Sequence, residues 1–220
     1  MEKYIRVTGK GQIAVKPDLI RLNITLEDSS VKYEDTLEQS ATQVELLKDC
    51  FEKLGFARAD LKTLHFSIDT TYENYQDENH VWQNRFTGYK FHHNMKIEFD
   101  ANSERLGQVL YGLAHAEVSP EFHINYTIKD TESVKNQLLG RAVEDSKAKA
   151  VVLAKAADVE LGELVSLDYS FAEKNLVSEP MKRSMPLMKN ADMAMGSYNI
   201  NIQPDDILVS DTVTVIWQIG

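Results

Sequence analysis

The chain contains a single cysteine, Cys50, among its 220 residues. One cysteine excludes an internal disulfide and any metal site built from several thiolates. Long apolar runs are missing as well: the longest stretch without a charged side chain, residues 193–204, has 12 residues and is mostly polar. A membrane-spanning helix needs about 20 apolar residues, so none is expected.

The first 30 residues also lack the basic-then-apolar pattern of a signal peptide. The sequence as written is therefore predicted to be cytoplasmic, and to be periplasmic or envelope-bound if a leader has been removed. Basic residues are in the minority, because 24 Lys and Arg face 34 Asp and Glu, which leaves a net charge of −10. We therefore predict no nucleic-acid partner and no membrane insertion.

Two periods of apolar residues alternate along the chain. Period-two alternation, typical of half-buried strands, is found in residues 4–7, 12–15, 20–27, 64–72, 89–99, 122–128, 164–171 and 207–219. Spacings of three and four, typical of amphipathic helices, are found in residues 37–54, 103–115 and 132–157. Ser29 and Ser30 are expected to cap the first helix, Gly55 to end it, and the polar residues 73–84 to form a hairpin loop. The pattern predicts an α+β fold with a mixed, largely antiparallel sheet and helices packed against it.

Residues 172–206 have no clear period, and they hold three of the five prolines and five of the seven methionines. We predict a single domain over residues 1–220 in which 172–206 form a long Met-bearing insertion loop. Flexible methionines favour docking of this loop on an apolar groove of its own domain or of a neighbouring subunit. The alternative is a soft Cu(I) site formed by Met185, Met188, Met193 and Met195.

Gly9 and Gly11 stand in a glycine-containing opening segment that lacks the spacing of a phosphate-binding loop. We interpret them as a β-bulge or tight turn that interrupts the first strand. His92 and His93 are adjacent on a strand and must face opposite sides. His65 and His93 could meet on paired strands, which leaves open a small enzyme or metal site. No sequence pattern identifies catalytic, cofactor-binding or metal-ligating residues, and no cofactor is predicted.

The opening Val7-Thr8-Gly9-Lys10-Gly11, followed by Val15-Lys16-Pro17-Asp18, resembles the SIMPL-domain proteins of bacteria. Further similarity lies in Leu61-Lys62-Thr63, Thr87-Gly88-Tyr89 and Leu161-Gly162, and in Ala142, Asp145, Ala148, Lys149, Ala150, Leu153 and Ala154 of the predicted long helix. The resemblance implies an α+β domain that assembles into homo-oligomers, with periplasmic or envelope members linked to oxidative-stress tolerance. It implies no catalytic residues.

These observations lead to one principal hypothesis and one alternative. The principal hypothesis is a non-enzymatic, self-associating SIMPL-domain protein that protects against oxidative stress, with no identified protein partner other than its own copies. The alternative is a small-ligand or Cu(I)-binding module that uses the Met-bearing loop.

Overall fold

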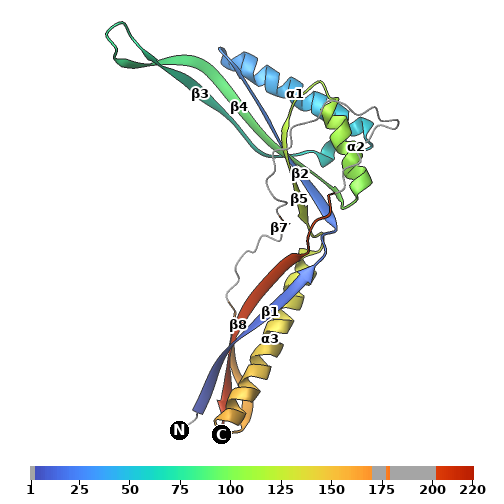
Figure 1. The fold of residues 1–220 in the computed structure, drawn as a ribbon, viewed down its shortest axis with the longest axis vertical. Coiled ribbons are helices and arrows are strands. Elements are labelled where there is room, and N and C mark those ends of the chain that lie inside the picture. The colour runs from blue at the N-terminus through green and yellow to red at the C-terminus, as the bar shows by residue number, and fades with distance from the viewer. Residues whose placement is uncertain (1–2, 170–176, 179–201) are drawn as a thin grey trace. The chain divides into compact units, whose positions relative to one another are not determined.

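The computed structural model describes residues 3–169, 177–178 and 202–220. The chain divides into two compact units (Figure 1). Of the described residues, the first unit comprises 3–18, 127–169, 177–178 and 204–220, and the second comprises 19–126 and 202–203. No helix in the described ranges is both long enough and apolar enough to cross a membrane.

The first unit is a three-stranded antiparallel sheet with one long helix against it (Figure 1). Its elements are β1 (Lys3–Val15), α3 (Thr131–Ala156), β6 (Leu161–Asp168) and β8 (Ile207–Ile219), and the strand order is β1-β8-β6. The strands β1 and β8 pair over their whole length, which brings the two ends of the chain side by side. The predicted boundaries of the last strand are confirmed.

Strand β1 runs without interruption through Gly9 and Gly11, so the predicted break at these glycines is wrong. Neither glycine has a positive φ, whereas Gly55 and Gly88 do. The amphipathic helix predicted over residues 132–157 is present as α3, and its small residues Ala142, Ser146, Ala150 and Ala154 are buried. Leu153 is exposed.

The second unit is built on paired strands in the order β3-β4-β2-β5. Its elements are β2 (Leu19–Ser30), α1 (Tyr33–Lys53), the short 3₁₀ helix η1 (Arg58–Asp60), β3 (Lys62–Gln76), β4 (Trp82–Asp100), α2 (Ser103–Ala114) and β5 (Glu121–Thr127). The two-residue β7 (Val177–Ser178) falls within the residue range of the first unit. Side chains from α1 and α2 share one apolar core with the inward faces of β2 and β4. The fold is α+β with antiparallel pairing, as predicted.

Of the two predictions for the ends of α1, one is confirmed and one is wrong. Gly55 follows the helix with a φ of +84°, as expected for a glycine that ends a helix. Ser29 and Ser30 are not caps, because both belong to β2. The helix starts after Lys32, which makes no capping side-chain hydrogen bond.

The segment predicted as a loop, residues 73–84, is mostly strand. Strand β3 continues to Gln76 and β4 starts at Trp82, so the turn covers only residues 77–81. Strand β2 ends with Ser30 opposite Tyr89. Within the described residues, the paired segments 72–76 and 82–87 therefore have no third strand, and we call these segments the ribbon. Figure 1 shows the ribbon and its turn extending past the start of α1.

Candidate functional site

The glycines of the opening motif allow β1 and α3 to pack at backbone distance. A Cβ atom on Gly9 would lie 1.9 Å from the carbonyl oxygen of Ala142, and one on Gly11 would lie 2.0 Å from that of Leu138. Only a glycine Cα hydrogen fits against these oxygens, in the manner of a weak Cα–H···O contact. The motif therefore builds the interior of the first unit and not a phosphate site.

Side chains of α3 occupy the outer edge of β1. The Asp145 carboxylate accepts the Lys10 backbone N–H at 2.7 Å and the Lys149 ammonium at 2.6 Å. The Arg141 guanidinium donates to the Gln12 carbonyl at 2.9 Å. Lys149, and then the Lys10 amide, lower the pKa of Asp145. Exposed strand edges invite pairing with other chains, so this row of side chains closes the β1 edge to such pairing.

Asp18, at the end of the same motif, ties two backbone segments together. Its carboxylate accepts the Lys129 N–H at 2.8 Å, and its own N–H donates to the Thr127 carbonyl at 3.2 Å. These bonds fix the end of β1 next to the residues that lead into α3. Each of the motif residues Gly9, Gly11 and Asp18 thus has a structural role.

The histidines do not form a common site. His65 pairs with Asn94 and Phe66 pairs with His93, so His65 and His93 lie on opposite faces of the sheet. His92 lies 2.7 Å from the Glu27 carboxylate, to which Lys90 also binds. Hydrogen bonds from Lys90, and then from His92, lower the pKa of Glu27. Glu27, Lys90 and His92 therefore form an exposed ion-paired cluster on the sheet surface.

His93 contacts hydroxyl groups from two neighbouring elements. Its Nε2 atom lies 2.8 Å from the Thr63 hydroxyl and its Nδ1 atom 3.4 Å from the Ser40 hydroxyl. Burial, and secondarily the charge of Lys48, lowers the pKa of His93. An imidazole beside a hydroxyl can act as a base, but in known nucleophilic sites a third group orients that base. Here the second nitrogen faces a buried serine, so His93 links β4 to α1 and β3.

We assign no functional site to the sulfur-containing residues that the structure describes. Burial raises the pKa of the Cys50 thiol, which keeps it protonated and unreactive at neutral pH. In residues 3–169, 177–178 and 202–220, no three His, Cys, Asp or Glu side chains gather where they could hold a metal ion. Met185, Met188, Met193 and Met195 lie outside the described residues, so the Cu(I) alternative stays a prediction.

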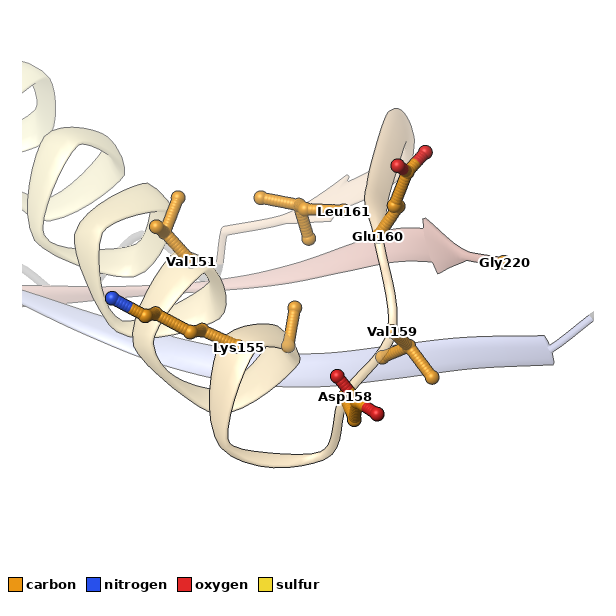
Figure 2. A pocket seen from close by; sticks show the side chains of 8 residues that line it. Val151, Lys155, Asp158, Val159, Glu160, Leu161 and Gly220 are labelled. Carbon is orange, nitrogen blue, oxygen red and sulfur yellow. The ribbon is translucent and has the colours of Figure 1, made fainter.

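Two of the cavities lined by described residues are open to solvent. One, of about 540 Å³, lies where α3 turns into β6 and is lined by Val151, Lys155, Asp158, Glu160 and Leu161 among others (Figure 2). The other, of about 450 Å³, lies along α1 and is lined by polar residues such as Gln39 and Gln43. Ligand pockets are usually concave and largely apolar, and neither cavity has this character.

The most unusual surface is a row of aromatic side chains on one face of the ribbon. Tyr33, at the start of α1, contacts Tyr89 edge-to-face with ring centroids 5.4 Å apart. The row continues from Tyr89 to Phe86 at 5.3 Å and from Phe86 to Tyr72 at 5.8 Å. Trp82 lies on the same face, because it is four residues before Phe86 in the same strand. We call these five residues the aromatic strip.

The other face of the ribbon carries its charges. Glu73 and Arg85 face each other across the strands and form an ion pair, and the Arg85 guanidinium lies 5.5 Å from the Tyr75 ring. In the turn, the Asp77 carboxylate accepts the Val81 and Asn79 N–H groups, which lower its pKa. The ribbon therefore has a charged face, an ordered acidic turn and an aromatic face.

Reasoning from periodicity missed this surface, although composition contains a signal. The chain has two Trp, nine Tyr and eight Phe, and seven of these nineteen aromatic residues fall within residues 66–91. Such a concentration around residues 73–84, the segment predicted as a polar loop, indicates an interaction surface, because aromatic residues are enriched at interfaces.

Comparison with known sequences identifies the family of this chain. The model of the SIMPL family, described as a protein of unknown function (DUF541), matches residues 5–217. The chain belongs to the SIMPL family. Two curated relatives, both called 26 kDa periplasmic immunogenic protein, come from Brucella melitensis and Brucella abortus. Each is 26% identical to this SIMPL protein over 163 residues, which cover 74% of this chain and 65% of the relative.

The family match spans both compact units and includes the motif residues described above. The resemblance inferred from the opening motif is therefore confirmed. Since the match covers less than two thirds of the Brucella proteins, their properties as whole proteins do not transfer directly to this SIMPL protein.

Proposed function

We propose that this SIMPL protein is a non-enzymatic, self-associating protein of the bacterial envelope. The aromatic face of the ribbon carries the proposal, because it exposes large apolar side chains on a projecting element. Tyr33, Tyr72, Trp82 and Phe86 have exposures of 44–69%. Contiguous apolar surface on a soluble chain usually marks an interaction site.

The described polar groups support a structural role over a catalytic one. Asp145, Asp18 and Glu27 each form hydrogen bonds or ion pairs within the fold. His93 contacts two hydroxyl groups from neighbouring elements. Catalytic groups are usually found in a cleft with strongly shifted pKa values, and these groups are instead distributed over several surfaces of both units.

Placement in the envelope is supported by the relatives. The Brucella proteins are named as periplasmic. The oxidative-stress role stays a prediction drawn from the family resemblance. The Cu(I) alternative stays a prediction because Met185, Met188, Met193 and Met195 lie outside the described residues.

Native mass spectrometry of the full chain at micromolar concentration tests self-association. We expect one discrete oligomer, and a monomer at all concentrations would contradict the proposal. Osmotic-shock fractionation of the bacterium that encodes the chain tests its placement. We expect recovery with the periplasmic fraction, and recovery with cytoplasmic marker proteins would refute this part.

A further inference from the structure

We infer that a second copy of the same chain docks on the aromatic strip of the ribbon, an inference that rests on the proposed self-association. The ribbon has only two strands over residues 72–76 and 82–87 in the described structure. Isolated two-stranded ribbons are marginally stable in water. Covering the aromatic face with another protein surface would therefore stabilise the ribbon, because it would bury the exposed aromatic side chains.

Charge favours this face over the others as the place where copies meet. Between the aromatic residues, the same face carries only the uncharged Asn74, Gln76 and Asn84. Glu73 and Arg85 lie on the opposite face. Two chains that each carry a net charge of −10 repel one another, and interface centres are depleted of charged residues. An uncharged face brings no like charges into contact.

The available area fits a contact between two copies. At about 150–250 Å² per aromatic side chain, the exposures of Tyr33, Tyr72, Trp82 and Phe86 leave about 450 Å² per copy. Stable interfaces bury about 800 Å² per partner. Val31, Leu37 and Val81, near the two ends of the strip, are exposed and supply further apolar area. Two strips related by a two-fold axis can therefore form the core of a standard interface.

A lipid surface is a poorer match for the strip. The turn beside Trp82 carries Asp77 and Glu78, and Asp77 is held ionised by backbone N–H groups. These carboxylates would approach the headgroups together with the aromatic rings. Anionic envelopes repel such a turn, whereas a second ribbon can place its own turn at the far end of the contact.

The first test replaces Tyr72, Trp82 and Phe86 together by Thr, which keeps a strand-forming side chain. We expect association to weaken by at least about 1,000-fold, because each aromatic residue at an interface centre contributes about tenfold or more. Tyr75→Thr, on the charged face of the same ribbon, should leave the oligomer unchanged. Far-ultraviolet circular dichroism checks that both variants are folded.

The second test uses disulfide cross-linking and leaves the aromatic side chains of the strip in place. In a Cys50→Ser background, Asn84→Cys places the only thiol on the strip face, and Gln83→Cys places it on the opposite face. We expect a disulfide-linked dimer under mild oxidation from Asn84→Cys and little from Gln83→Cys. Equal cross-linking from both positions would overturn the assignment of the face.

The outcomes separate this inference from the proposed function. A wild-type monomer would refute both. A wild-type oligomer that persists in the triple Thr variant would refute the strip as the contact while leaving self-association intact. If the wild type is monomeric and binds neutral phosphatidylcholine vesicles only when the strip is intact, lipid occupies the strip and the inference is wrong.

Discussion

Replacing Gly9 or Gly11 by Ala should destabilise the first unit, although alanine favours regular structure more than glycine does. A new Cβ at either position would lie 1.9 or 2.0 Å from a backbone carbonyl oxygen of α3. Real Cβ atoms keep at least about 3.0 Å from such an atom. The strand and helix must therefore separate by about 1 Å, and a backbone oxygen cannot rotate away as a side chain can.

The magnitude follows from two opposing effects. Reduced freedom of the unfolded chain stabilises an alanine variant by about 0.4–1 kcal/mol. Overpacking of a core costs about 1–3 kcal/mol or more, and here the blocking atoms belong to the helix backbone. Separation also opens the contact that buries Ala142 and Ser146. We expect each variant to lose about 2 kcal/mol of unfolding free energy.

Gly140 in α3 provides the matched control, since a Cβ there would meet no atom within 4 Å. Gly140→Ala should stabilise the unit by about 1 kcal/mol, the intrinsic helix preference of alanine over glycine. The same chemical change thus has opposite signs at a strand glycine that packs against a helix backbone and at a helix glycine with open space around it.

Tryptophan fluorescence can isolate the first unit. The chain has two tryptophans, of which Trp217 lies in β8 and Trp82 in the ribbon. In a Trp82→Phe background, urea unfolding followed by fluorescence reports the environment of Trp217 alone. If Gly9→Ala and Gly11→Ala leave the midpoint unchanged or raise it, the close packing of β1 on α3 is wrong.

Three further predictions concern separate contacts. Asn102→Ala removes the side chain that caps α2 and should cost about 1 kcal/mol in urea unfolding of the second unit; an unchanged midpoint would contradict the cap. The pKa of His93 is lowered in the folded chain and is about 6.5 in an unfolded one, so the unfolded state binds more protons just below that pH. The unfolding free energy should then fall as pH drops below about 6.5, and His93→Gln should reduce this slope; equal slopes would argue against it. Asp145→Ala removes the carboxylate that binds the Lys10 amide and should lower the urea midpoint and increase light scattering on heating. Glu144→Ala, at the neighbouring exposed position, should do neither, and equal behaviour would mean that the β1 edge is not protected by Asp145.

Periodicity correctly predicted the elements that bury one face against a core and expose the other face to solvent. Strand β8 has the boundaries expected from its alternating valines, and α2 ends one residue before its predicted end. In both, apolar residues face a core and polar residues face solvent, which is the condition that produces a readable period. The glycines of β1 failed the same method because their role depends on α3, more than 120 residues away in the chain.

The candidate site was harder to predict for a different physical reason. On the aromatic face of the ribbon, Tyr72, Trp82 and Phe86 alternate with Asn74, Gln76 and Asn84, which are polar but uncharged. The opposite face holds Tyr75 beside Glu73 and Arg85. Apolar and polar residues thus occur on both faces, and the period-two signal disappears.

What distinguishes the two faces of the ribbon is charge and not hydrophobicity. A protein core excludes polar side chains of every kind, whereas an interface between folded chains accepts uncharged polar groups and excludes mainly charges. A strand that faces a partner outside its own chain therefore follows a different rule from a strand that faces a core. By that rule, a second copy can cover the face of the ribbon that carries Tyr72 and Trp82 without burying a charged group, because the other side chains between the aromatic residues on that face are uncharged amides.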